Sequence, residues 1–137
     1  MIFIDTSAFL PRFTSRDQYH ALSSKYWSLL ENSDESHFTS NFVLDEMFTL
    51  LARRTGYCFA AERAKNLYSS KRLIILRPDE EDELNAIVLF EKYADQKVSF
   101  TDCISFVLMK RRNIQKVFTF DKHFKRAGFE IVPSIEL

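Results

Sequence analysis

The chain has 137 residues, and its 19 lysines and arginines are balanced by 19 aspartates and glutamates. Apolar residues make up 46% of the sequence and aromatic residues 15%, which excludes intrinsic disorder and predicts one domain over residues 1–137 with a sizeable core. The zero net charge excludes a protein that holds nucleic acid by overall positive charge, but a local basic patch stays open.

In chain order, the apolar patterning predicts a strand at 2–5, helices at 6–12 and 17–32, a strand at 37–39, helices at 41–55 and 58–71, a strand at 73–77, helices at 79–93 and 101–113, a strand at 117–120, a helical turn at 122–127 and a strand at 130–132. This alternation predicts an α/β fold with a mostly parallel sheet flanked by helices.

The sequence carries no sign of export or of a membrane segment. Cys58 and Cys103 fit neither a metal-type spacing nor a disulfide framework, so we expect thiols in a reducing compartment. No basic segment precedes the first apolar run, which Asp5 interrupts, and no stretch approaches the roughly 20 apolar residues of a spanning helix. We therefore expect a cytoplasmic protein without a signal peptide.

Only two glycines are present, and neither belongs to a glycine-rich loop. Their scarcity excludes a P-loop nucleotide site and a Rossmann dinucleotide site. Gly56 follows Arg54-Thr55 and Gly128 follows Arg126-Ala127, a pattern that predicts the C-terminal caps of two helices.

Four acidic residues fall where a parallel sheet would bring them together. Asp5 and Asp121 each follow a predicted strand, and Glu46 and Asp102 lie near the starts of two apolar helices. The carboxyl ends of parallel strands and the starts of the following helices share one edge of the sheet. Four negative charges there repel one another unless a cation lies between them, which predicts a divalent metal site.

Each acid also has a structural interpretation that its local sequence leaves open. Asp5 and Asp121 fit N-caps of the helices that follow them, and Asp102 fits a capping box that begins at Ser99. Glu46 lies at the margin of an apolar helix face, where a carboxylate needs a partner. Capping and metal binding can also coexist in one first turn.

Four segments taken together resemble the PIN-domain nucleases, and among them the VapC-type toxins of bacterial and archaeal toxin–antitoxin pairs. The segments are Ile2-Phe3-Ile4-Asp5-Thr6-Ser7, the apolar helix that holds Glu46, Ser99-Phe100-Thr101-Asp102-Cys103, and Thr119-Phe120-Asp121-Lys122-His123-Phe124. Each is weak alone, but four in this order at fitting separations are specific, and the resemblance spans essentially the whole chain.

The resemblance implies a three-layer α/β/α fold, Mg²⁺ or Mn²⁺ as cofactor, endonucleolytic cleavage of RNA, a homodimer and neutralisation by an antitoxin. The four acids of the family correspond to Asp5, Glu46, Asp102 and Asp121. The family's hydroxyl beside the first acid corresponds to Thr6 or Ser7, and its threonine before the last acid to Thr119. Cys103 is a mild departure, because a smaller residue such as alanine is more usual there.

The chemistry of the ligands agrees with the implied cofactor. An all-oxygen, carboxylate-rich site suits hard cations such as Mg²⁺ and Mn²⁺ and disfavours zinc. We expect Asp5, Asp102 and Asp121 to hold metal, and Glu46 to ligate it or to orient the attacking water. The three histidines are scattered, and His123, which lies nearest to an acid, is interpreted as a surface or RNA-facing residue rather than a ligand.

Basic residues gather in the last third of the chain. Their nearness in sequence to two of the acids predicts a rim that binds RNA phosphates, although a solvated helix face explains some of them equally well. The predicted RNA-binding residues are Lys110, Arg111, Arg112, Lys116, Lys122 and Lys125.

Two other classes of protein could also explain clustered acids. A phosphoacceptor signalling domain would need paired acids after the first strand, whereas Asp5 stands alone. An inactive PIN-like interaction module would not need all four acids.

Overall fold

Five short strands form one sheet in which all neighbouring strands are parallel. The computed structural model describes residues 1–134. The strands are β1 (Ile2–Ile4), β2 (His37–Ser40), β3 (Leu73–Leu76), β4 (Lys116–Phe118) and β5 (Glu130–Val132). Their order in the sheet is β3-β2-β1-β4-β5. The predicted mostly parallel sheet is confirmed.

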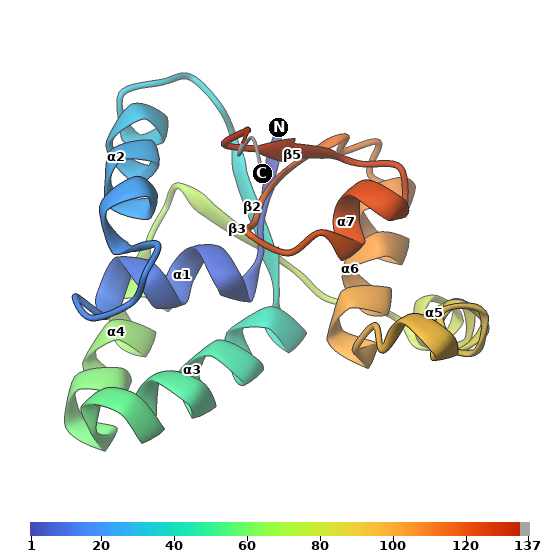
Figure 1. The fold of residues 1–137 in the computed structure, drawn as a ribbon, viewed down its shortest axis with the longest axis horizontal. Helices are drawn as coiled ribbons and strands as arrows, with labels where there is room; N and C mark the ends of the chain where they lie inside the picture. The colour runs from blue at the N-terminus through green and yellow to red at the C-terminus, as the bar shows by residue number, and fades with distance from the viewer. Residues whose placement is uncertain (135–137) are drawn as a thin grey trace.

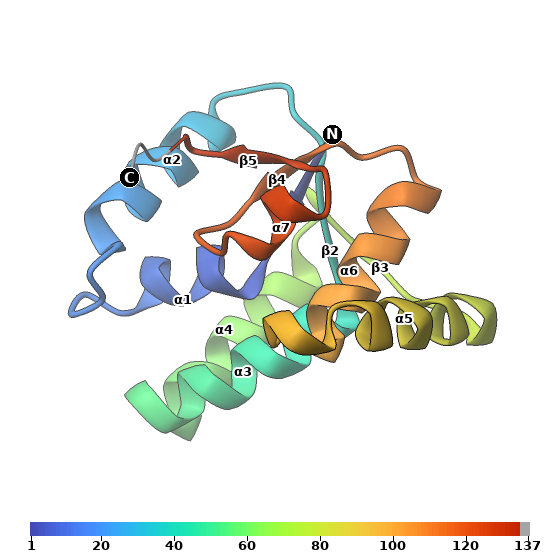
Figure 2. The same ribbon diagram turned by 45° about the vertical axis from the view of Figure 1, so that its right-hand side comes forward.

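Helices cover both faces of this sheet. They are α1 (Thr6–Phe13), α2 (His20–Glu31), α3 (Asn41–Thr55), α4 (Tyr57–Ser69), α5 (Glu80–Lys92), α6 (Phe100–Arg111) and α7 (His123–Arg126), with a 3₁₀ turn at Ala94–Gln96. Figure 1 shows α1 and α2 on one side of the strands, and α5, α6 and α7 on the other. Figure 2 shows α3 and α4 running side by side, in agreement with their contacts. The predicted three-layer architecture is confirmed.

The direction of the strand order reverses at β1. The chain passes from β1 to β2 and β3 on one side, and then crosses back to place β4 on the other side of β1. Ile4, the last residue of β1, lies opposite Phe118, the last residue of β4. Such a reversal opens a crevice at the carboxyl ends of the two strands, which is where open α/β sheets bind their ligands. The segments that follow β1 and β4 therefore meet at this crevice.

The core fixes the elements that flank the crevice. The β1 side chains are fully buried, and α6 is buried over most of its surface, as its apolar sequence predicts. The Phe106 ring on α6 lies 5.0 Å from the Phe124 ring on α7, edge to face. Because close-packed interiors resist small shifts, α6 and α7 hold their polar residues in a defined relation.

Two of the boundaries that differ from the prediction are set by a side chain that caps the backbone. The helix predicted from residue 17 begins at His20, because the Asp17 side chain accepts a hydrogen bond from the Tyr19 amide at 2.9 Å and forms a turn. The strand predicted to include Asp5 ends at Ile4, because Asp5 is the N-cap of α1. Gly56 and Gly128 have positive φ and close helices as predicted.

None of the helices within residues 1–134 combines the length and the apolar character that a membrane span requires.

Candidate active site

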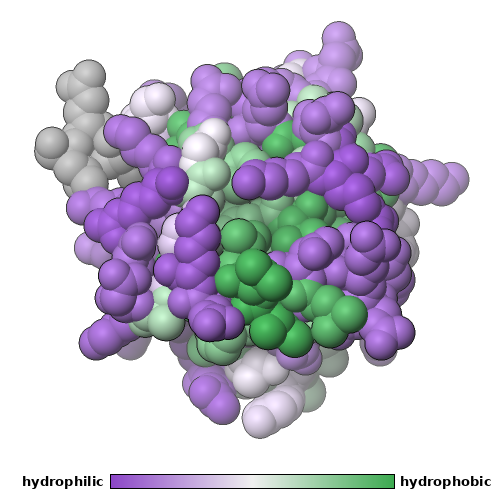
Figure 3. Space-filling view, turned by 90° about the vertical axis from the view of Figure 1, so that its right-hand side faces the viewer, coloured by the Kyte–Doolittle hydropathy of each residue, from purple (hydrophilic) through white to green (hydrophobic). Residues whose placement is uncertain are grey.

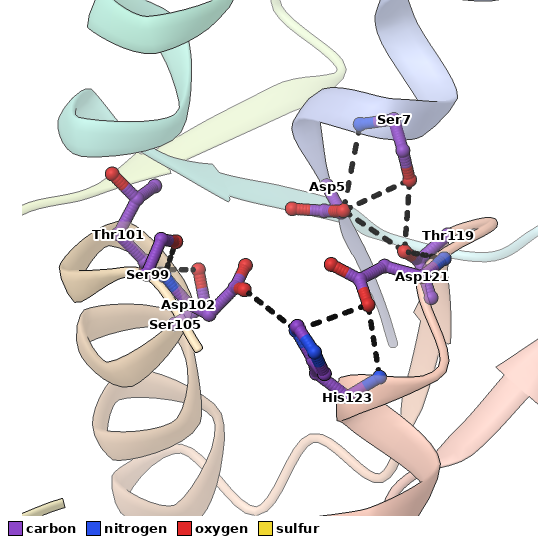
Figure 4. A network of polar contacts seen from close by, with 9 residues as sticks. All are labelled: Asp5, Ser7, Ser99, Thr101, Asp102, Ser105, Thr119, Asp121 and His123. Atoms are coloured by element: carbon purple, nitrogen blue, oxygen red, sulfur yellow. Dashed lines mark hydrogen bonds and ion pairs between the residues drawn. The ribbon is translucent and has the colours of Figure 1, made fainter. Parts of the chain in front are cut away.

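Asp5 lies at the end of β1, where two hydroxyl groups hold one of its carboxylate oxygens. Ser7 Oγ donates to Asp5 Oδ2 at 2.9 Å, and Thr119 Oγ1 donates to the same oxygen at 2.8 Å. Asp5 is 3% exposed. Figure 4 shows its other oxygen pointing away from these two hydroxyls. The carboxylate is thus oriented by one oxygen and free to bind a ligand with the other.

The same hydroxyls join the carboxyl ends of β1 and β4. Ser7 Oγ accepts a hydrogen bond from the Phe120 amide at 2.9 Å, and Thr119 Oγ1 accepts one from the Asp121 amide at 3.0 Å. Thr6, the other hydroxyl considered in the sequence, donates instead to a backbone carbonyl of α3 at 3.5 Å. Of the two hydroxyls, therefore, Ser7 is the one that contacts Asp5.

Asp102 faces Asp5 across the crevice from the first turn of α6. Ser99 caps this helix, because its Oγ accepts a hydrogen bond from the Asp102 amide at 3.0 Å. The cap fixes the backbone of Asp102 and leaves its carboxylate directed into the crevice (Figure 4). The sequence left open whether Asp102 belongs to a cap or to the acidic group, and in the structure it belongs to both.

Asp121 follows β4 and begins a tight turn into α7. Its Oδ1 accepts a hydrogen bond from the His123 amide at 2.9 Å, and the same oxygen lies 3.2 Å from His123 Nδ1. His123 Nδ1 also lies 3.4 Å from Asp102 Oδ2. The imidazole therefore stands between two of the acids, a position that the sequence interpretation of His123 as a surface residue did not give.

Glu46 reaches the group from the second turn of α3 and is half-buried. Burial and the charge of Asp121 raise the pKa of Asp102, and the negative charge of Glu46 raises it further. Within residues 1–134 Glu46 forms no ion pair with a lysine, an arginine or a histidine. The structure thus brings all four predicted acids to one edge of the sheet.

The electrostatics of the group follow from burial without compensation. Burial, and then the charge of Asp102, raises the pKa of Asp5 to about 7, although hydrogen bonds from Thr119 and Ser7 lower it. Burial, and then the charges of Asp121 and Glu46, raises the pKa of Asp102 to about 7. Such shifts report that the ionised forms lack a positive partner.

The donor set fits a divalent cation. Among the described residues no lysine or arginine is paired with any of the four acids. One oxygen each from Asp102 and Asp121, together with a His123 nitrogen, lie within 4.8 Å of one another, close enough to share one ion. Carboxylate oxygens are ligands of Mg²⁺ and Mn²⁺, and a bound cation would relieve the repulsion that raises both pKa values.

The predicted basic rim is divided between the two ends of the sheet. Lys122 and Lys125 are exposed on the turn and helix that follow Asp121. Lys110, Arg111 and Arg112 lie at the far end of α6, about 12 Å or more along its axis from Asp102.

Two of these residues also have acidic partners outside the crevice. Arg111 pairs with Asp82 at 2.5 Å, and Lys116, at the amino end of β4, pairs with Glu35. The structure therefore does not bring these two together with the acids, because sequence proximity along a helix or strand is not proximity in space.

Comparison with known proteins decides the family. The family model described as PIN domain matches residues 2–130. The chain belongs to the PIN-domain family. A 23S rRNA-specific endonuclease of Mycobacterium tuberculosis, VapC20, is 33% identical over 130 residues, which are 94% of this chain and 95% of that protein. The chain is thus a homologue of the VapC-type ribonuclease toxins, and the family excludes a phosphoacceptor signalling domain.

Solved structures agree with this membership. The crystal structure of Mycobacterium tuberculosis VapC20, described as a sarcin-ricin loop cleaving toxin, gives a TM-score of 0.86 at 29% identity and covers 94% of this chain and 96% of that one. DNA-bound VapBC from Salmonella typhimurium gives 0.66 at 15% identity, with 95% of each chain covered. FitAcB from Neisseria gonorrhoeae gives 0.63 at 17%, with 96% of each covered. The last two show the shared PIN fold.

Proposed function

We propose that this PIN protein cleaves RNA by a hydrolysis that depends on Mg²⁺ or Mn²⁺ held at the acidic crevice. The observation that carries this proposal is the burial of Asp5 and Asp102 beside two further acids with no lysine or arginine partner among residues 1–134. Buried carboxylates without a cation destabilise a fold, so their presence together is explained by a ligand that they bind.

In the proposed mechanism each side chain has one task. Asp5, Asp102 and Asp121 hold the cation, and Ser7 and Thr119 keep Asp5 oriented through their hydrogen bonds to its Oδ2. Glu46 orients the attacking water from α3. A bound divalent cation lowers the pKa of a coordinated water and offsets charge on the scissile phosphate. Lys122 and Lys125 bind flanking phosphates, a role that their exposure beside Asp121 supports.

We propose a structured loop of ribosomal RNA as the substrate. The proposal rests on the likeness to VapC20, which is described as specific for 23S rRNA and as cleaving the sarcin-ricin loop. Single-stranded loops expose bases and phosphates to a protein, whereas paired stems hide their base edges.

The test uses the full-length protein and a short RNA that carries the sarcin-ricin loop. We expect cleavage with Mn²⁺ or Mg²⁺, no cleavage with EDTA, and recovery when the metal is restored. A scrambled loop on the same stem is the control for substrate choice. Full activity in EDTA would exclude the metal mechanism, and equal cutting of both loops would exclude the substrate assignment alone.

We also propose that the protein forms a homodimer and is neutralised by an antitoxin. VapBC and FitAcB, whose fold the chain shares, are the named complexes among the structural relatives. Apolar side chains stand exposed along α5, where Figure 3 shows a continuous apolar area. They are Leu84, Ile87, Val88 and Phe90, exposed by 57%, 50%, 64% and 46%. Patches of this kind mark protein contacts, and an isologous pair would bury this one.

Molar mass in solution tests the dimer. We expect twice the chain mass for the natural protein, and the single mass for an Ile87→Glu/Val88→Glu variant that folds normally. A natural protein that stays monomeric at micromolar concentration would exclude the dimer. Co-expression with the product of the adjacent gene, followed by loss of RNA cleavage by the purified complex, tests the antitoxin.

A further inference from the structure

One nitrogen atom of His123 faces two carboxylates at once. Nδ1 lies 3.2 Å from Asp121 Oδ1 and 3.4 Å from Asp102 Oδ2 (Figure 4). Asp121 Oδ1 already accepts a hydrogen bond from the backbone amide of His123. The imidazole, 24% exposed, therefore points inward to the acidic crevice rather than outward to solvent.

A single hydrogen on Nδ1 cannot form good hydrogen bonds to both carboxylates. An imidazole nitrogen carries at most one hydrogen, which can lie on the line to only one of the two oxygens. In the tautomer without a hydrogen on Nδ1, a lone pair would face two negative groups. A cation between the three atoms would attract all of them, because a nitrogen lone pair and two carboxylate oxygens are all electron donors.

The separations match those of neighbouring ligands on a small cation. Two ligands at right angles, each about 2.1 Å from a metal ion, are about 3.0 Å apart. The two contacts of Nδ1 exceed this by only 0.2 and 0.4 Å, taking 3.2 and 3.4 Å against about 3.0 Å. His123 is also held in place, because the adjacent Phe124 ring is fully buried against Phe106.

We propose that His123 Nδ1 is a ligand of the metal ion, so that the centre has a mixed nitrogen and oxygen donor set. This inference rests on the proposed metal dependence and adds a consequence for the choice of ion. Imidazole suits first-row transition metals, whereas Mg²⁺ takes oxygen ligands and keeps much of its water. The centre therefore selects Mn²⁺ over Mg²⁺, and His123 supplies the selectivity.

The decisive experiment observes the nitrogen without measuring activity. Mn²⁺ is bound to the full-length protein, and electron spin-echo modulation is recorded with ¹⁴N-histidine and with ¹⁵N-histidine incorporated. We expect a modulation from a directly bound imidazole that changes with the isotope and is absent in His123→Gln. The matched control is His20→Gln, because the His20 ring contacts the Pro11 carbonyl, outside the acidic group, and its modulation should remain.

Metal titrations by calorimetry give a second readout. We expect His123→Gln to weaken Mn²⁺ binding by about tenfold and Mg²⁺ binding by less than about threefold. Mn²⁺ bound without any histidine modulation, or equal losses for both ions, would overturn the role of His123 and leave the proposed ribonuclease function intact. Failure of Mn²⁺ to bind the natural protein at millimolar concentration would overturn both.

Discussion

Two helices that pack against each other, α5 and α6, each carry a buried aspartate as the third residue of the helix. Asp82 on α5 is 3% exposed and Asp102 on α6 is 7% exposed. Asp82 completes a capping box with Asp79 and receives Arg111 at 2.5 Å. Asp102 faces three other acids and one imidazole. Burial alone is therefore no sign of function, and the sign is burial without a positive partner.

The largest expected contrast between the two aspartates is in catalysis. Asp102→Asn should lower RNA cleavage with Mn²⁺ by more than about 100-fold, the upper range for loss of a group that only supports a metal ligand. Asp82→Asn, a matched change of one charge in the same position of the neighbouring helix, should stay within a few-fold of the natural rate. Initial rates on labelled RNA measure both, with circular dichroism as the check on folding. Similar losses in the two variants would mean that the acidic crevice is not the catalytic centre.

The second contrast is in stability, for which the ion pair of Asp82 is expected to matter. Arg111→Met should lower the free energy of unfolding by about 2 kcal/mol, because it leaves the buried Asp82 carboxylate without its cation, while the half-exposed arginine limits the loss. Adding Asp82→Asn to this variant should recover part of the loss, since a neutral amide needs no cation. Urea unfolding in EDTA gives these values. If the double variant is no more stable than Arg111→Met, then the pair contributes nothing beyond packing.

A smaller effect is expected in the pH dependence of stability without metal. The folded-state pKa of Asp5 and of Asp102 lies near 7, above the ordinary value of 3.8, so the folded form binds more protons between these limits. Lowering the pH from 8 to 5.5 in EDTA should therefore stabilise the protein, with a slope of up to about 1.4 kcal/mol per pH unit for one extra proton.

Two conditions sharpen this pH test. Asp102→Asn should be more stable than the natural protein at pH 8 in EDTA and should show a flatter pH profile, because repulsion within the group is reduced. Saturating Mn²⁺ should remove or reverse the slope, since protons then compete with the metal. A natural protein that loses stability steadily from pH 8 to 5.5 in EDTA would contradict the unpaired state of these acids.

The smallest effect concerns phosphate contacts at the two ends of the sheet. On an inactive Asp5→Asn background, Lys122→Ala/Lys125→Ala should flatten the slope of log affinity against log salt by about 0.7 for each lost contact with single-stranded RNA. Lys110→Ala/Arg112→Ala removes the same charge from the far end of α6 and should leave the slope unchanged. The opposite result would place the RNA along α6 and away from α7.

Much of the fold and of the acidic site could be predicted from local sequence, because strands, helix caps and acids that follow strands are local signals. Asp5 and Ser99 are helix caps that short-range rules identify, and parallel strands bring their carboxyl ends together whatever the intervening chain does. The position of the His123 side chain could not be predicted, because His123 begins a four-residue helix after a tight turn, where sequence periodicity does not indicate the direction of a side chain. The assignment of Lys116 to the RNA-binding rim rests on proximity in sequence and is wrong, because β4 carries Lys116 to the end of the sheet opposite Asp121.

The position of β4 next to β1 has a consequence for when the acidic centre is completed during synthesis of the chain. The hydrogen bond between Thr119 and Asp5 joins residues 114 positions apart. The strand β1 therefore cannot pair with β4 until residues 116–118 have been translated. A nascent chain whose residues 116–123 are still inside the ribosome lacks Asp121 and Thr119, one of the two hydroxyls that orient Asp5. The acidic centre is therefore incomplete on the ribosome until residues 116–123 have left the exit tunnel.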